Sequence, residues 1–126
     1  RGLGDVYKRQ NKNILLIDPL PYSEFILTLR HSLLVLTDSG GIQEEAHTLG
    51  IPTLILRDAT ERPEVLLEGN ALLVGTDSNR IEIEINDLIR NSNGFKSNKK
   101  NLNTFGDGNA SKFISEKTIE FLNKKK

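Results

Sequence analysis

The residues best suited to chemistry are Thr37–Gly41 (TDSGG), which lead directly into a helical pattern. A helix start offers backbone N–H groups without intrahelical partners and a partial positive charge, and glycines let a phosphate approach that backbone closely. Ser39 would add a hydroxyl donor. The same residues also suit an ordinary helix cap by Asp38 or Ser39. TDSGG matches neither GxGxxG nor GxxxxGKS, so spacing alone leaves both interpretations open.

Two adjacent carboxylates lie about one turn inside this helical pattern. Glu45 borders the apolar face formed by Ile42, Ala46 and Leu49, and its carboxylate could accept two hydrogen bonds from a ribose diol. A solvated Glu45 is the alternative. Glu44 points elsewhere on the helix, so we expect it to be solvated.

Two arginines follow the next apolar run. Pro63 holds the backbone of Arg62 extended, from where the guanidinium could reach a diphosphate. Arg57 is the competing candidate. Either arginine could instead form a surface ion pair with one of three nearby carboxylates, Asp58, Glu61 or Glu64.

The remaining reactive residue types predict no catalytic or metal site. His31 and His47 are 16 residues apart without ligand spacing, so we expect each to be structural or exposed. Ser39 lies in DSGG rather than in GxSxG, which argues against a nucleophile elbow. With no cysteine, the chain has no thiolate metal site and no disulfide, which favours the cytosol.

The elements that must position these residues are short apolar runs alternating with amphipathic stretches. Continuous apolar runs predict strands buried on both faces, near residues 14–17, 33–36, 53–56 and 71–74. Helical patterns cover residues 22–30, 41–49, a short stretch from Pro63, 81–89 and 110–123. Residues 91–103 could be a loop or a poorly amphipathic helix. The order predicts an α/β fold with a Rossmann-like parallel sheet and flanking helices.

In such a sheet, ligands bind beyond the carboxyl ends of the strands. The loops Asp18–Pro21, Thr37–Gly41 and Arg57–Arg62 should therefore line one edge.

Composition excludes several partners and indicates a fragment. The 126 residues carry 17 basic and 17 acidic side chains, which gives no case for nucleic acid or an anionic membrane. No apolar run approaches the roughly 18 residues of a membrane span. The chain has no methionine, so we expect a fragment of a longer protein or a processed product. Residues 1–10 (RGLGDVYKRQ) resemble a translated adapter from metagenomic assemblies, so we expect residues 11–126 to be the native part; a genuine basic N-terminal segment is the alternative.

Three blocks resemble the non-hydrolysing UDP-N-acetylglucosamine 2-epimerases. They are DPLPYSEF (18–25), the run from Thr37 to Asp77 with SGGIQEEA and RDATERPE, and FGDGNAS (105–111). The resemblance covers about residues 12–123. It implies a partial C-terminal domain of a two-domain GT-B fold, lacking that domain's first part. It also implies a homodimeric parent of surface-polysaccharide biosynthesis, with UDP-N-acetylglucosamine or UDP as partner and neither metal nor cofactor. The many Asn, Lys and Ile residues indicate a bacterial source, and the absence of cysteine agrees with a cytoplasmic one.

The resemblance also implies roles for single residues. Ser39, Gly40 and Gly41 would contact the UDP phosphates, Glu45 the ribose, and Arg62 another part of UDP. Phe25 and Leu20 would lie near the uracil, where leucine offers only backbone and apolar surface. The family's acid/base carboxylates and functional histidine lie in other parts of the enzyme, so no catalytic residue is expected here.

Three alternatives remain at this stage. A hydrolysing 2-epimerase would release free N-acetylmannosamine, and a GT-B glycosyltransferase would use a similar helix start and ribose-binding glutamate. The TERPE run and the late GDG argue against a generic transferase. A structural domain without any ligand fits poorly with the polar loops gathered at one edge.

Overall fold

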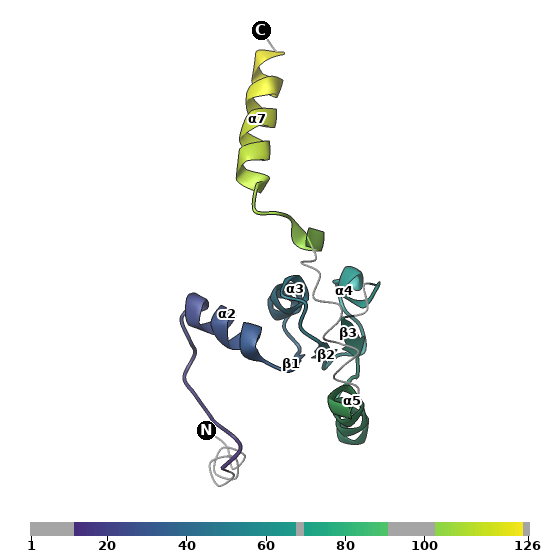
Figure 1. The fold of residues 1–126 in the computed structure, drawn as a ribbon. Coiled ribbons are helices and arrows are strands. Elements are labelled where there is room, and N and C mark those ends of the chain that lie inside the picture. Colours follow the sequence, from purple (N-terminus) through teal and green to yellow (C-terminus); the bar gives the residue numbers. More distant parts are fainter. Residues whose placement is uncertain (1–11, 68–69, 91–102, 125–126) are drawn as a thin grey trace.

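A parallel sheet forms the centre of the chain in the computed structural model, which describes residues 12–67, 70–90 and 103–124 (Figure 1). Its described strands are β1 (Val35–Thr37), β2 (Thr53–Ile55) and β3 (Ala71–Leu73), in the order β1-β2-β3. Leu54 of β2 lies between Leu36 and Leu72 of its neighbours. All three strands run the same way, so their carboxyl ends meet at one edge. The predicted α/β class is confirmed.

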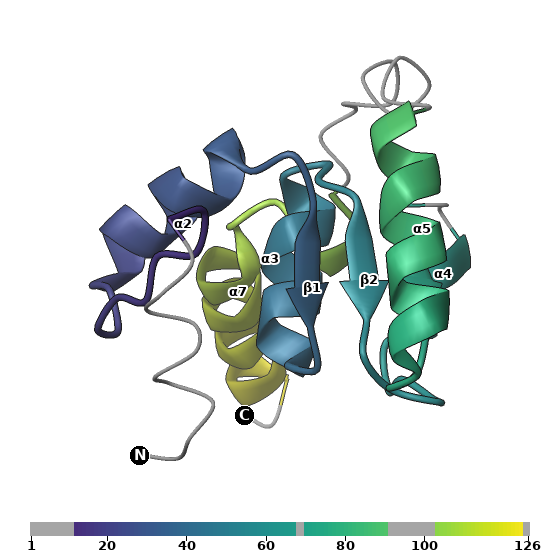
Figure 2. The ribbon, with the colours of Figure 1, turned by 90° about the horizontal axis from the view of Figure 1, so that it is seen from below.

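Helices cover both sides of this sheet. They are α2 (Tyr22–His31), α3 (Gly40–Thr48), α4 (Pro63–Leu67), α5 (Ser78–Arg90) and α7 (Ala110–Asn123), with a 3₁₀ turn, η2, at Asn103–Phe105. Figures 1 and 2 show α3 against β1 and β2, with α5 on the opposite side of the sheet. Each helix agrees with a helical pattern in the sequence. The adapter-like leader and residues 91–102 lie outside the described part of the chain.

The core lies beneath α3 and fixes the position of that helix. Ala46 of α3 is fully buried and joins Leu29, Val35 and Ile51 in one apolar cluster, against which Phe25 packs. Apolar burial of this kind is the main favourable term in folding. Because the cluster draws on α2, β1 and α3, it holds α2 next to the body of α3.

His47 attaches the C-terminal segment to the same helix. Its ring is 1% exposed, lies 3.1 Å from the Thr104 hydroxyl through Nε2, and meets Phe105 edge to face at 5.5 Å. The predicted structural role of His47 is therefore confirmed. His31 is exposed, as expected, with Nδ1 2.8 Å from the Leu27 carbonyl oxygen.

The strand predicted at residues 14–17 is wrong. These four residues form no strand, and their side chains are 43–84% exposed. An apolar run only indicates a tendency toward burial, whereas a strand also needs a neighbour whose backbone groups pair with its own. Within the described residues, β1 pairs only with β2, and residues 14–17 do not continue the sheet. The loop Asp18–Pro21 therefore enters α2 without leaving a strand.

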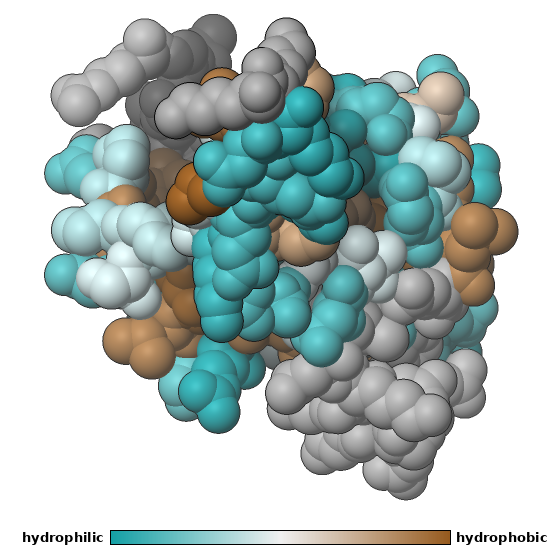
Figure 3. Space-filling model, turned by 90° about the horizontal axis from the view of Figure 1, so that it is seen from above, coloured by the Kyte–Doolittle hydropathy of each residue, from teal (hydrophilic) through white to brown (hydrophobic). Residues whose placement is uncertain are grey.

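The last helix carries much of the exposed apolar surface. Figure 1 shows α7 standing away from the sheet, and five of its large apolar side chains are 58–62% exposed: Phe113, Ile114, Ile119, Phe121 and Leu122. Seen from above, apolar patches lie between hydrophilic ones (Figure 3). In the described ranges, no helix combines the length and apolar character needed to cross a membrane.

Candidate functional site

The start of α3 lies at the carboxyl end of β1 and presents backbone N–H groups. Ser39 occupies the N-cap position, but its side chain makes no capping hydrogen bond, and the first turn contains no acidic residue. The first intrahelical bond is the one that the Gln43 N–H donates to the Ser39 carbonyl, at 3.1 Å. The N–H groups of Gly40, Gly41 and Ile42 precede that bond. Ser39 therefore occupies the predicted cap position without a side-chain capping bond, which leaves the first N–H groups of the helix without an intrahelical partner, as an anion site requires.

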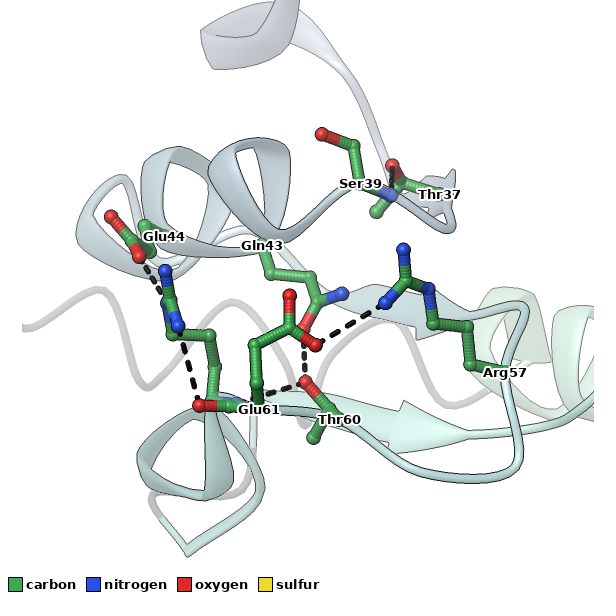
Figure 4. A network of polar contacts seen from close by, with 8 residues as sticks. Thr37, Ser39, Gln43, Glu44, Arg57, Thr60 and Glu61 are labelled. Atoms are coloured by element: carbon green, nitrogen blue, oxygen red, sulfur yellow. Dashed lines mark hydrogen bonds and ion pairs between the residues drawn. The ribbon is translucent and has the colours of Figure 1, made fainter.

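A carboxylate from the neighbouring loop already lies against this helix start. A Cβ added to Gly40 would be 2.7 Å from Oε1 of Glu61, so only glycine fits this approach without a shift. The other oxygen of Glu61 accepts a hydrogen bond from Arg57 at 3.2 Å (Figure 4). An ion pair of Arg57 with Glu61 was one of the predicted alternatives and is confirmed. The position of the carboxylate agrees with the preference of helix N-termini for negative charge.

Arg62 contacts α3 one turn further along. Its Nε donates a hydrogen bond to Oε1 of Glu44, and this bond is the main cause that raises the pKa of the Arg62 guanidinium above its ordinary value. The prediction that Glu44 is merely solvated is wrong, and the partner of Arg62 is none of the three carboxylates proposed from the sequence. Glu44 and Arg62 are 18 residues apart. Only the packing of the loop 57–62 beside α3 makes them neighbours.

Glu45 faces the start of α2. The hydroxyl of Tyr22 donates a 2.6 Å hydrogen bond to Oε1 of Glu45. Two predicted site residues lie in the same region: Leu20, which is half-buried just before α2, and Phe25, which is half-buried on α2 against the core. The structure thus places Glu45 beside the start of α2, the helix that Leu20 precedes and that carries Phe25, while Arg62 contacts Glu44.

The bond between Tyr22 and Glu45 leads to a pH prediction. The hydrogen bond with Glu45 raises the pKa of Tyr22 above its ordinary value, because the carboxylate stabilises the protonated phenol. A raised pKa in the folded state means that the bond contributes to stability below the ordinary phenol pKa, and that the contribution is lost as pH rises through the higher folded value. We expect the Glu45→Gln variant to bring the pKa of Tyr22 back toward the ordinary range.

Tyrosine-specific ¹³C NMR measures this directly, since Tyr7 and Tyr22 are the only tyrosines. Glu44→Gln is the matched control, because it removes the adjacent carboxylate without touching the phenol. An unchanged Tyr22 titration in Glu45→Gln would show that the two side chains do not interact in solution.

Partly buried hydrogen bonds connect α3 with the loop after β2, and they were not predicted from the sequence. Oε1 of Gln43 accepts a 2.7 Å hydrogen bond from Thr60, and the Thr60 hydroxyl oxygen accepts one from the Arg62 backbone N–H at 3.1 Å. Gln43 lies three residues before Ala46 and is 1% exposed. A polar residue at helical spacing with the buried face was the sequence signal that could have found it.

No metal centre accompanies this arrangement in the described ranges, where no three histidine, cysteine or acidic side chains are grouped to hold an ion. The helix start, its glycines and the surrounding carboxylates and arginines can bind a ligand with both phosphate and hydroxyl groups. They do not by themselves form an acid/base pair around a reacting carbon.

Comparison with known proteins identifies one family. The family model described as UDP-N-acetylglucosamine 2-epimerase matches residues 2–118. A curated relative of that name from Escherichia coli is 48% identical over 105 residues, which are 83% of this chain and 28% of the relative. The chain thus spans under a third of the length of that relative.

Solved structures give the same family. The chain resembles the UDP-GlcNAc 2-epimerase of Neisseria meningitidis bound to UDP-GlcNAc, with a TM-score of 0.74 and 40% identity over 89% of this chain and 31% of that one. It also resembles the S. aureus MnaA-UDP co-structure, with a TM-score of 0.83 and 34% identity, covering 95% of this chain and 33% of that one.

Proposed function

Because the chain belongs to the UDP-N-acetylglucosamine 2-epimerase family, we propose that it is the nucleotide-binding part of an enzyme that interconverts UDP-N-acetylglucosamine and UDP-N-acetylmannosamine. The reaction inverts C2 of the sugar in two steps. The C2 proton and UDP are eliminated to give a 2-acetamidoglucal, and UDP is then added back at C1 while a proton is delivered to the opposite face of C2. The single observation that carries this proposal for the described residues is the uncapped, glycine-rich start of α3 at the edge of a parallel sheet.

In the proposed site, the diphosphate lies at the start of α3. The N–H groups of Gly40 and Gly41 and the Ser39 hydroxyl would donate hydrogen bonds to the phosphate oxygens, with the helix dipole adding to the attraction. Glu61 now lies against Gly40 and would yield this position to the ligand. Its departure would release Arg57 as a further cation.

The nucleoside lies between α3 and the start of α2 in this proposal. Glu45 would exchange its bond with Tyr22 for hydrogen bonds with the ribose diol. Leu20 and Phe25 would offer apolar surface to the uracil, because both are half-buried in this region. Arg62 would leave Glu44 and contact UDP directly. Alternatively, Arg62 would keep its bond with Glu44 and so hold that carboxylate away from UDP.

In this proposal, the acid and base groups that catalysis needs come from outside this chain. Properly placed acids and bases contribute about 10²–10⁴-fold to a rate, so their absence leaves a binding half-site. The other part of the intact enzyme would provide these groups and would cover apolar surface such as that of α7. We also propose, following the family resemblance, that the intact enzyme is a cytoplasmic homodimer.

A UDP titration of the 126-residue chain by amide NMR tests the binding proposal. We expect saturable shifts centred on Ser39–Ile42 and Glu45, which would contact the nucleotide, and on Tyr22, which would lose its bond with Glu45. Ser39→Ala should weaken UDP binding about 10- to 100-fold, because it removes one hydrogen bond to a charged group, worth about 1.5–3 kcal/mol. Ser111→Ala on α7 is the matched control and should bind as the wild type does. Shifts confined to other elements, or none, would contradict a preformed half-site.

A chimera tests the reaction. Residues 12–124 would replace the matching segment of the Escherichia coli relative. The chimera should form UDP-N-acetylmannosamine from UDP-N-acetylglucosamine and incorporate solvent deuterium at C2. Release of free N-acetylmannosamine would instead indicate a hydrolysing enzyme.

A further inference from the structure

The carboxamide of Gln43 is buried between α3 and the loop after β2. Its oxygen is held by Thr60 at 2.7 Å, and Thr60 in turn binds the backbone of Arg62 at 3.1 Å. These two bonds fix the orientation of the amide, because the Thr60 hydroxyl accepts from Arg62 and donates its own proton to Gln43. The nitrogen, Nε2, must therefore point away from Thr60.

This nitrogen has no hydrogen-bond partner within the described residues, although Gln43 is 1% exposed. Figure 4 shows Nε2 directed toward the space between the guanidinium of Arg57 and the Thr37–Ser39 segment before α3. Burying an amide donor without a partner is unfavourable, and native proteins rarely leave one so. A ligand that enters this space would supply the missing acceptor.

The groups around this space determine the chemistry of that ligand. The start of α3 presents N–H donors, and Arg57 presents a guanidinium. The carboxylate of Glu61, which lies against Gly40, is paired with Arg57. Donors and positive charge converge with the free N–H₂ of Gln43, so the complementary ligand is an anion with several acceptor oxygens. A diphosphate has this property, whereas an amine or a metal cation does not.

We propose that Gln43 recognises the diphosphate, an inference that rests on the UDP site proposed above. Its Nε2 donates a hydrogen bond to a phosphate oxygen once the ligand displaces Glu61, while its Oε1 keeps the loop of Arg57 and Arg62 in place through Thr60. One carboxamide thus couples the phosphate to the loop that carries both arginines.

The side-chain amide signals of Gln43 provide a test in the wild-type chain, with a variant needed only to assign them. Gln10 and Gln43 are the only glutamines, so the Gln43→Met variant assigns their N–H₂ pairs in an NMR spectrum of the 126-residue chain. We expect UDP, and to a smaller degree UMP, to shift the Gln43 pair and slow its hydrogen exchange. Uridine, which lacks phosphate, should leave the pair unchanged.

Affinities of the variants separate a phosphate contact from a purely structural role. Gln43→Met keeps the side-chain volume and should lower UDP affinity about tenfold or more, while uridine affinity stays within about twofold. Thr60→Val should weaken UDP binding, because it removes the hydroxyl that links Gln43 to the loop 57–62. Thr60→Ser keeps a hydroxyl and should bind UDP as the wild type does. Gln43→Glu places an acceptor opposite the phosphate and should be the weakest binder of UDP.

Two results would overturn the proposal in distinguishable ways. If the wild type binds UDP but its Gln43 amide pair does not respond, or if Gln43→Met weakens UDP and uridine equally, Gln43 is only structural and the UDP site stands. If the wild type binds neither UDP nor UMP, the proposed function of this half-site fails and the role of Gln43 fails with it.

Discussion

Replacing Gly41 with aspartate should abolish UDP binding while leaving the chain folded. A Cβ at Gly41 would meet no atom within 4 Å, and the residue is exposed in the first turn of α3. An aspartate there should even stabilise the helix by about 0.3–1 kcal/mol through the helix dipole. The same carboxylate would face the diphosphate at close range. Repulsion at about 4 Å costs about 1 kcal/mol per pair of unit charges in water and about 4 kcal/mol near a protein surface.

Since a diphosphate carries more than one negative charge, we expect UDP affinity to fall at least about 100-fold. Isothermal titration calorimetry measures the affinity, and thermal unfolding measures stability. Gly41→Asn is the matched control because it has the same size without the charge, so its loss should be much smaller. Equal UDP affinity in Gly41→Asp and the wild type would place the phosphates away from α3.

Replacing Glu45 with alanine should remove the distinction between UDP and its 2′-deoxy analogue. In the free chain Glu45 accepts a hydrogen bond from Tyr22, and in the proposed complex it accepts from the ribose hydroxyls instead. A hydrogen bond to a charged group contributes about 1.5–3 kcal/mol, which is about 10- to 100-fold in affinity. We therefore expect the wild type to prefer UDP over 2′-deoxy-UDP, and Glu45→Ala to bind both with the same low affinity.

Tyr22→Phe is the control for this prediction. It removes the bond that competes with the ribose, so UDP affinity should stay the same or rise slightly. Competition titrations with the two nucleotides measure the preference. If Glu45→Ala keeps the wild-type preference, the role of Glu45 is limited to holding Tyr22 and the start of α2.

The helices and most of the sheet could be predicted from local pattern because these elements are governed by short-range physics. Residues 53–55 lie within a continuous apolar run and are buried on both faces, as a central parallel strand requires. The helix Ala110–Asn123 begins and ends at the predicted residues. Residues 14–17 have the same apolar character, yet they lie outside any strand. Pairing depends on a neighbouring strand, and an apolar run contains no information about its neighbour.

The sequence by itself determined the α/β class, the family resemblance and the glycine-rich helix start, because each depends on residue types at short spacing. Tertiary structure alone decided which charged groups meet. Glu44 faces Arg62, Glu45 faces Tyr22, and the Gln43 amide lies beneath the helix start beside Thr60. These partners come from different elements, 17 to 23 residues apart. Their contacts arise because α2 and the loop 57–62 pack against α3. This packing cannot be predicted from the spacing of the residues along the chain.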